Sequence, residues 1–468
     1  MGFNFHLKFF SFNRTITISK QWAQFLIITS VILISTVVSF WGTRTIFILI
    51  GVLLAGAAGL LVLLKQPNYG FLLIFLSAAF VPFAGPSGLN AAMLMVVLML
   101  GLWIMDMLVV KRNLVLIRSR MLLPIVSFLI ISVIAMGMGQ IPWFVFARQA
   151  PVASQLGGFS IFVFSIGAML LAAHLIKDLR WLQIIVWSFI AIGTLYVLGR
   201  TLHLSFIDIV YQRAFVSGSM FWTWLVTLTA SQIIYNDKLS LRIKALLGGI
   251  ILLTLYVAVV QAYDWKSGWL PPLVALGVLI VNRFRKLIIL AIPVALFAGS
   301  YIVLDLISSD DYSWGTRLDA WKIVLEISRV SPILGMGFSN YYWYTPLFPI
   351  RGWRVSFNSH SQYIDLIAQT GYLGLLCFFW LLFEAGRLSW GLANKIPSGF
   401  ARAYSNGVFA GIIATLVAAF LVDWVLPFVY NIGLTGFRAS VLPWIFIGGL
   451  IAIEQMELPK NKIVKEEF

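Results

Sequence analysis

The chain has 468 residues, of which 61% are hydrophobic and only 11% are charged, and its mean hydropathy is +0.96. A water-soluble fold of this composition would carry a largely apolar surface, so the sequence excludes the soluble classes and indicates a polytopic membrane protein. The formal net charge of +16 could suggest a nucleic-acid partner. Most of the positive charge, however, falls in alternate loops between apolar segments, as the positive-inside rule requires, and we therefore expect no nucleic acid.

Apolar runs long enough to cross about 30 Å of hydrocarbon as helices recur along the chain. The predicted fold is therefore an all-α integral membrane protein, a bundle of about 12–14 transmembrane helices. In chain order we place the spans at residues 22–42, 46–64, 69–84, 89–110, 121–139, 157–176, 181–199, 217–235, 244–262, 268–282, 287–305, 361–386, 405–424 and 432–453. The spans at 69–84 and 268–282 are short and could be re-entrant or tilted.

The alternation of basic loops also predicts the domain organisation and the topology, with both chain ends on the cytoplasmic side. The first span follows a basic stretch and lacks a small-residue cleavage site, so we expect it to be retained. The predicted parts are a cytoplasmic tail at 1–21, transmembrane helices 1 to about 11 at 22–305, a large periplasmic loop at 306–359, the C-terminal transmembrane helices at 360–453 and a cytoplasmic tail at 454–468.

A second group of cations falls on the predicted outer side, against the charge rule. An arginine inside a span costs at least about 2.5–3.5 kcal/mol, so each such residue indicates snorkelling, a surface ion pair or an anionic partner. For the group as a whole we favour an anion-binding site. Its members are Arg44, Arg148, Arg200, Arg213, Lys266, Arg317, Lys322, Arg329, Arg351 and Arg354, with Arg438 in or near the last span.

The sequence offers no pattern for a metal or a cofactor. Cys377 is the only cysteine, which leaves no disulfide framework and no cysteine-based metal site. The four histidines, His6, His174, His203 and His360, are far apart, and neither a phosphate-binding loop nor a nucleophile elbow is present. We therefore expect no metal and no cofactor.

The outer segment has its own organisation. Residues 316–330 follow the pattern of an amphipathic helix suited to the membrane interface, with Asp319, Lys322, Glu326 and Arg329 on its charged face. Arg317 falls toward the apolar side near the helix N-terminus, where a bound anion would also meet unpaired backbone N–H groups. Ser331-Pro332 is predicted to end the helix, and Gly335-Met336-Gly337 to form a tight turn.

These residues resemble a known family. Arg317 and Trp321, followed by Pro332, Gly335-Met336-Gly337, His360 and Gly371-Tyr372-Leu373-Gly374, are similar to the signature of the O-antigen ligase and polymerase superfamily of bacterial membrane glycosyltransferases. Upstream, Arg213-Ala214-Phe215 leading into Gly218 is similar to the arginine motif that opens a central helix in that family. The resemblance covers residues 200–440. This chain has Ser361 where the family usually has asparagine, and Lys266-Ser267 where a Ser-Arg pair is common.

The resemblance implies transfer of a glycan from an undecaprenyl-diphosphate carrier to an acceptor hydroxyl on a glycan or lipid, at the outer face of the bacterial inner membrane. It implies His360 as the general base, since an imidazole can accept a proton near neutral pH. Cations must bind the diphosphate, for which we expect Arg213 and Arg317 first, then Arg148, Lys266 and Arg354. Trp321, Tyr341 and Trp343 are possible glycan contacts. Membrane lipid and other polysaccharide assembly proteins are the further partners expected.

Several alternatives stay open at the level of the sequence. The run Tyr341-Tyr342-Trp343-Tyr344 suits either an interfacial aromatic belt or a sugar-stacking surface. Asp365 is the nearest rival to His360 as the base, although we expect it to serve as an ion-pair partner. A bundle of this size would also suit a polysaccharide or lipid-carrier flippase. No motif distinguishes a polymerase from a ligase.

Overall fold

The computed structural model describes residues 28–29, 44–113, 116–289, 293, 300 and 311–466. The chain forms two compact units, one made of residues 1–69 and 104–115 and the other of residues 70–103 and 116–468. Every described regular element is a helix, apart from two isolated bridges that join Ala84 to Asn90 and Ile350 to Trp353. The protein is therefore all-α, as predicted.

The first unit contains one long described helix, α2 (Arg44–Lys65). It also contains the π-helical turn Asp106–Val110, which continues from α4 (Ala91–Met105). Lys111, the residue after this turn, forms an ion pair with Asp106.

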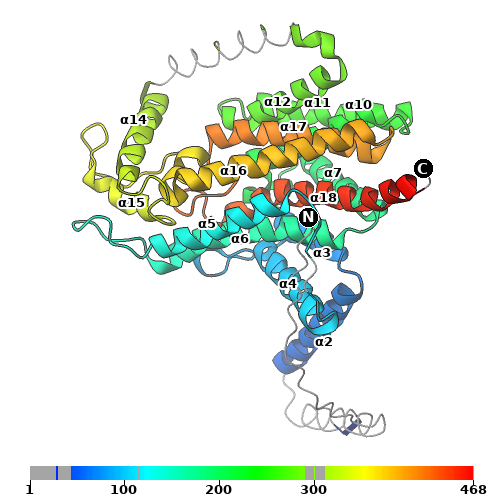
Figure 1. Ribbon diagram of the computed structural model, residues 1–468, viewed down its shortest axis with the longest axis horizontal. Helices are drawn as coiled ribbons and strands as arrows, with labels where there is room; N and C mark the ends of the chain where they lie inside the picture. Colours follow the sequence, from blue (N-terminus) through cyan, green and yellow to red (C-terminus); the bar gives the residue numbers. More distant parts are fainter. Residues whose placement is uncertain are drawn as a thin grey trace. The chain divides into compact units, whose positions relative to one another are not determined.

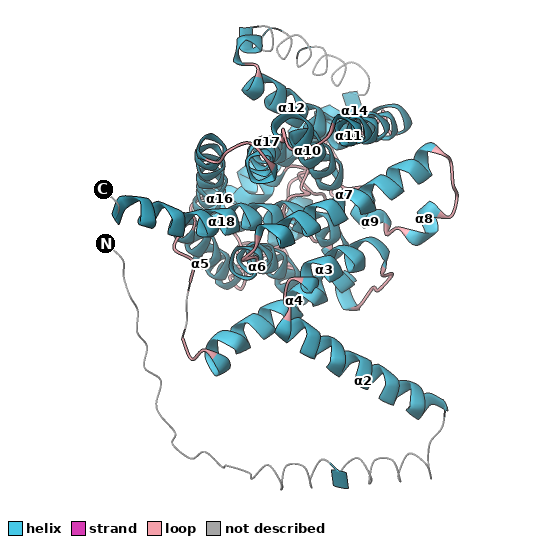
Figure 2. Ribbon diagram, turned by 90° about the vertical axis from the view of Figure 1, so that its right-hand side faces the viewer, coloured by secondary structure: helices cyan, strands magenta, loops and turns pink. Residues whose placement is uncertain are grey.

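The second unit holds the bundle, in which long helices lie side by side (Figure 1). Figure 2 shows α10, α16 and α17 as neighbours in the view turned by 90°. Besides α4, its helices are α3 (Tyr69–Phe80), α5 (Leu122–Met138), α6 (Val152–Leu175), α7 (Leu179–Thr201), α8 (Ile207–Val210), α9 (Arg213–Val216), α10 (Ser219–Tyr235), α11 (Leu241–Leu255) with the π-helical turn Tyr256–Gln261, α12 (Lys266–Arg283), α14 (Asp311–Ile327), α15 (Asn340–Tyr344), α16 (Gln362–Lys395), α17 (Phe400–Leu421) and α18 (Phe437–Glu466).

Two helices form the centre of this bundle. In α10 every residue from Ser219 to Gln232 is buried, and the apolar stretch of α18 is buried throughout. α10 packs against α12 and α17, while α18 packs against α6. A helix that is apolar on all sides belongs in a protein interior, because it has no polar face to turn outward.

Seven helices in the described residues are long and apolar enough to cross a membrane, which supports a multi-pass membrane protein. They run over Ala91–Val110, Val152–Leu175, Leu179–Thr201, Leu241–Gln261, Gln362–Lys395, Phe400–Leu421 and Leu434–Glu457. The structure therefore gives seven such helices where the sequence predicted about 12–14 spans. The predicted spans at 22–42 and 287–305 fall almost wholly outside the described residues. α3, α5 and α10 are shorter than the other spans, and α12 contains Pro271 and Pro272.

A break in α16 positions the site. Gly371 has φ +71° and ψ −179°, a conformation that only glycine adopts readily, and it interrupts the helix. Segment 332–337 packs into this break, where the amides of Met336 and Gly337 donate to the carbonyls of Ala368 and Gln369 at 2.9 and 3.0 Å. In return, the amide of Tyr372 donates to the Pro332 carbonyl at 2.8 Å. The two glycine motifs of the sequence are therefore two halves of one backbone junction.

α14 occupies the place of the predicted amphipathic helix, and the chain leaves it at Ser331 as expected. Val324 and Ile327 are fully buried in a cluster with Tyr341, Ala368 and Phe428. The protein itself therefore covers this apolar side, and the covering does not require a membrane.

Candidate functional site

A cavity of about 330 Å³ lies where α14, α15, segment 350–360 and the loop between α17 and α18 meet. It is polar in a bundle that is otherwise strongly apolar. Its lining residues are Thr316, Arg317, Ala320, Tyr342, Ile350, Ser356, Phe357, Asn358, His360, Tyr430 and Asn431. We call it the His360 cavity. Arg317 and His360, both predicted from the sequence, thus line the same cavity, although 42 residues lie between them in the chain.

His360 stands on an unusual backbone. Its φ is +51°, in the left-handed region that side chains with a Cβ rarely adopt. Its neighbours hold it there: the Trp321 indole donates to the Ser359 carbonyl at 2.7 Å, and the Ser361 amide donates to Ser359 Oγ at 3.0 Å. Strain of this kind persists where the surroundings impose it, and it is common at functional sites.

A buried polar cluster supports the segment around His360 from the side of α16. Tyr341 OH donates to Asp365 Oδ1 and accepts from the Ser359 amide at 3.3 Å, and Ser359 Oγ lies 2.7 Å from the same carboxylate oxygen. Tyr341 and Asp365 are both fully buried. The expectation that Asp365 serves in an ion pair is wrong, because among the described residues hydroxyl groups, not cations, contact its carboxylate. Asp365 fixes the segment before His360 through Ser359 instead.

On the other side, His360 meets the loop between α17 and α18. Asn431 Nδ2 lies 3.4 Å from His360 Nδ1 and donates to Asp423 Oδ1 at 2.7 Å. Asp423 is fully buried, and its second oxygen has no hydrogen-bond partner in the described part of the chain. Arg317 Nη1 donates to the Leu421 carbonyl at 3.2 Å, two residues from Asp423. The loop therefore joins the cation, the imidazole and a buried carboxylate.

The electrostatics follow from burial. Burial, with a smaller contribution from the Arg317 guanidinium, lowers the pKa of His360 from 6.5 to about 4. Burial raises the pKa of Asp423 from 3.8 to about 6, while its hydrogen bond from Asn431 and the charge of Arg317 act in the opposite direction. Near pH 7 the site accordingly holds a neutral imidazole, a carboxylate and a guanidinium.

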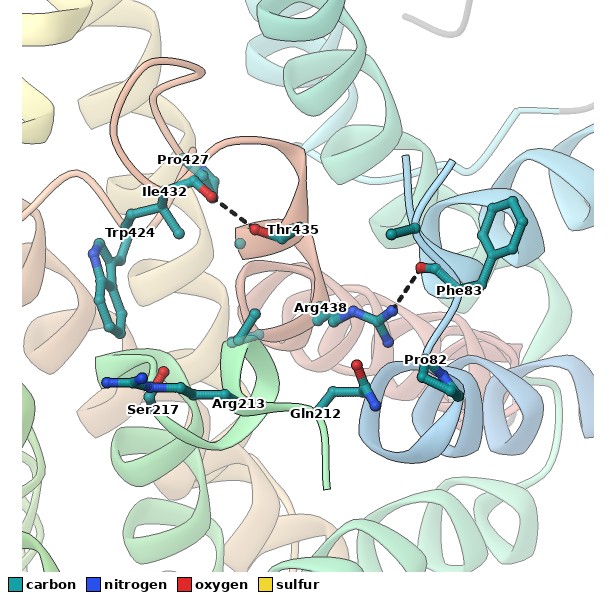
Figure 3. A pocket seen from close by; sticks show the side chains of 14 residues that line it. Pro82, Phe83, Gln212, Arg213, Ser217, Trp424, Pro427, Ile432, Thr435 and Arg438 are labelled. Carbon is teal, nitrogen blue, oxygen red and sulfur yellow. Dashed lines mark hydrogen bonds between the residues drawn. The ribbon is translucent and has the colours of Figure 1, made fainter. Parts of the chain in front are cut away.

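A second cavity, of about 400 Å³, is lined by other residues of the same loop and contains Arg213 (Figure 3). We call it the Arg213 cavity. Figure 3 shows the Arg213 side chain reaching toward the side where Ser217 and Trp424 lie. Its lining residues are Pro82, Phe83, Ala84, Gln212, Arg213, Ala214, Ser217, Trp424, Pro427, Ile432, Thr435, Gly436, Arg438 and Ala439.

The two arginines of this second cavity differ in their partners. Arg438 is buried and donates to four carbonyls at or just beyond the end of α3, those of Ser77, Ala78, Val81 and Phe83, at 2.8–3.1 Å. A cation is favourable at a helix C-terminus, so Arg438 has a structural role there. Arg213 is exposed, and no described residue forms a hydrogen bond or an ion pair with its guanidinium. It is therefore the cation of this cavity that remains available to an anion.

The other predicted site residues line neither cavity. Arg148 and Arg354 are exposed on loops, and Lys266 is half-buried at the start of α12. The indoles of Trp321 and Trp343 donate to the Ser359 carbonyl and to Tyr430 OH.

The sequence left two interpretations of the aromatic run 341–344 open, an interfacial belt or a stacking surface, and the structure places its members in different surroundings. Tyr341 and Tyr344 are fully buried and belong to the protein core, whereas Tyr342 lines the His360 cavity and stacks on Tyr430 with ring centroids 4.5 Å apart. Tyr342, together with Tyr430, therefore presents its ring to the cavity, whereas Tyr341 does not.

Sequence reasoning missed Asp423, Asn431 and Tyr430. They lie in a short stretch between two apolar segments, where an aspartate and an asparagine interrupt an otherwise apolar run. Those two polar residues were the sequence feature that could have indicated a site. The sequence matches no known protein-family model and none of the curated proteins with which it was compared.

Proposed function

We propose that the protein is a membrane glycosyltransferase of the O-antigen ligase and polymerase type, which transfers a glycan from undecaprenyl diphosphate to an acceptor hydroxyl in the synthesis of a surface polysaccharide. The observation that carries this proposal is the meeting of a neutral imidazole, His360, and a guanidinium, Arg317, in one polar cavity. A base and an anion-binding cation are the two groups that this reaction requires of a protein.

The donor is an anion with a lipid tail, and the charges of the site suit its diphosphate. Arg317 lines the His360 cavity, and Arg213 lines the Arg213 cavity, to which other residues of the same 422–436 loop contribute. A guanidinium binds phosphate oxygens through two parallel hydrogen bonds, which a lysine cannot reproduce. In this proposal the two arginines hold the diphosphate and stabilise the charge that it gains as it leaves.

The acceptor hydroxyl attacks the anomeric carbon of the donor sugar, and its oxygen forms the new glycosidic bond. The bond from that carbon to the phosphate oxygen breaks, so undecaprenyl diphosphate leaves with the electron pair. The hydroxyl proton passes to His360. Glycosyl transfer of this kind changes no oxidation state, and its charges balance without any further reactant.

The contacts of His360 suggest which nitrogen takes the proton. The Asn431 amide nitrogen faces Nδ1, which makes Nδ1 the unprotonated nitrogen of the neutral ring. The 3.4 Å separation is long for a hydrogen bond, so an acceptor hydroxyl that displaces Asn431 loses little. A bound diphosphate would also offset the charge of Arg317, which lowers the basicity of the ring in the empty site, and would make His360 a stronger base.

The test is transfer by the purified full-length protein from a lipid-diphosphate-linked glycan, measured with wild-type, His360→Ala, Asp365→Asn and His203→Ala proteins. His203 is the matched control, an exposed histidine that also has a positive φ. We expect His360→Ala to lower turnover by about 10²–10⁴-fold, the usual contribution of a positioned base, and His203→Ala to have little effect. Because the pKa of His360 is about 4 in the protein without donor, its protonation should lower kcat/KM only below about pH 5.

Two results would contradict the proposal. Normal turnover in His360→Ala with a dead Asp365→Asn protein would move the base to Asp365. If the wild-type protein released no lipid diphosphate and only changed the side of the membrane on which the donor lies, the protein would be a flippase.

Arg213→Ala and Arg317→Ala should weaken donor binding, and the corresponding lysine variants should recover part of it.

A further inference from the structure

A further cavity, of about 660 Å³, lies between α5, α16 and α18. We call it the Glu454 cavity. Its lining residues are Ser119, Arg120, Met121, Glu384, Arg387, Leu388, Trp390, Gly391, Leu392, Lys395, Ile396, Glu454 and Glu457. None of these residues takes part in the site described above.

This cavity lies at the opposite end of the bundle from His360. Glu384 and Glu454 come 22 and 17 residues after the starts of α16 and α18, which are near the His360 cavity, so helix geometry places them roughly 25–33 Å away along the helices. α5 agrees, because Met121 precedes its first residue whereas the carbonyl of Gly139, just past its last residue, accepts from Asn340 near the proposed site. A separation of about 30 Å is the thickness of the hydrocarbon core, so the Glu454 cavity lies at the level of the opposite headgroup layer.

Charges of both signs line this cavity. Arg120, Arg387 and Lys395 are exposed cations, and Glu384, Glu454 and Glu457 are the carboxylates. Glu384 and Arg387 form an i,i+3 ion pair at 3.5 Å. Among the described residues neither Arg120 nor Lys395 forms an ion pair, and the buried Glu454 Oε2 has no hydrogen-bond partner. Ser119 and Arg120 interact with Glu454, so the groups left for a ligand are Lys395, the remaining N–H donors of Arg120 and the Glu454 Oε2 atom.

The rest of the wall is apolar. Met121, Leu392 and Ile396 are buried, and Leu388 and Trp390 complete the lining between the charged groups. A small soluble ion needs no such wall, whereas a lipid presents an apolar glycerol and acyl region directly beside its charged headgroup. The shape of the lining thus follows the structure of a membrane lipid.

We propose that the Glu454 cavity binds the headgroup of a zwitterionic aminophospholipid, of the phosphatidylethanolamine type. Arg120 and Lys395 contact its phosphate, and Glu454 accepts from its primary ammonium. An anionic lipid fits less well, because it would bring a second negative charge or no cation to the carboxylates. A choline headgroup carries the same charge but has no N–H group to donate to Glu454.

The experiment uses the full-length protein in nanodiscs of phosphatidylcholine that contain a minor fraction of either phosphatidylethanolamine or phosphatidylglycerol. Lipids that remain bound after release from the disc are counted by native mass spectrometry. A hydrogen bond to a charged group contributes about 1.5–3 kcal/mol, so we expect phosphatidylethanolamine to be enriched at least about tenfold over phosphatidylcholine. Glu454→Gln and Glu384→Gln should each reduce this enrichment. Arg120→Gln should reduce the binding of both phosphatidylethanolamine and phosphatidylcholine, because both carry the phosphate.

Matched controls distinguish the site from the general surface. Glu326→Gln removes an exposed carboxylate on α14, and Arg180→Gln removes an exposed cation near the start of α7; neither should change the enrichment. The wild-type comparison of three lipids needs no variant, so it decides the proposal even if a substitution prevents folding. Equal retention of the three lipids, or a preference for phosphatidylglycerol that Glu454→Gln strengthens, would overturn it. Displacement by soluble phosphoethanolamine at the same concentration as the lipid would assign the cavity to a soluble ligand instead.

Discussion

Asp423 is expected to lower the stability of the folded protein, because it is a fully buried carboxylate. The pKa of Asp423 rises from 3.8 to about 6 on folding, a shift of about two units, and each unit corresponds to 1.36 kcal/mol. The native state therefore binds more protons than the unfolded state between these two values, and the free energy of unfolding falls as the pH rises through this window. Above about pH 6 the full cost is about 3 kcal/mol.

Asp423→Asn removes the charge and keeps the shape and the oxygen that accepts from Asn431. We expect the loss of the charge to stabilise the variant relative to the wild type by as much as about 3 kcal/mol at pH 8 and by almost nothing near pH 4. The unpaired amide donor that asparagine adds lowers this figure by about 1–3 kcal/mol. That penalty does not depend on pH, so the change of the difference with pH is the quantity that tests the reasoning.

The assay is unfolding of both proteins in the same detergent at several pH values from 4 to 8, with Asp264→Asn as the control. Asp264 is exposed, so its substitution should change the free energy of unfolding little. Titration of His360 affects the wild type and the variant alike, so it largely cancels in their difference. A stability difference that stays constant with pH, or that favours the wild type increasingly as the pH rises, would refute the reasoning.

Two further predictions concern the backbone junction and the topology. Gly371→Ala would place a Cβ 2.1 Å from the Ile333 carbonyl oxygen at a φ of +71°. We expect backbone strain of about 1–3 kcal/mol, together with this clash, to abolish most of the folded protein. Gly248→Ala, which has open space around it, should be tolerated, and size-exclusion yield and thermal melting check both variants. A cysteine introduced at the exposed Phe146 should react with an impermeant reagent from outside the cell, whereas one introduced at the exposed Lys177 should react only after the membrane is opened. Labelling of Lys177→Cys from outside would reverse the predicted topology.

Local pattern in the sequence was enough to predict most of the helices, the end of one of them and the turn that follows it. The hydropathy of the chain places helices at most of the predicted spans, and Ser331 ends the helix before the turn as expected. Gly335 and Gly337 were predicted as turn residues, and both have a positive φ. These features depend on residues within a few positions of one another, and the sequence contains that information directly. The number of spans is supported only in part, because the described residues contain seven helices long and apolar enough to cross a membrane, and the predicted spans at 22–42 and 287–305 lie almost wholly outside those residues.

The surroundings of His360 depended on the tertiary structure. Asn431 is 71 residues from His360 in the chain, and the Asp423 carboxylate reaches the imidazole only through it. Burial then lowers the pKa of His360 and raises that of Asp423, a result that no local pattern contains. Tyr341 and Tyr342 are neighbours in the sequence, yet one is fully buried against Asp365 and the other lines the cavity. Side chains gain these roles from segments that meet only when the bundle packs, so the sequence could name His360 and Arg317 but could not show which groups surround them.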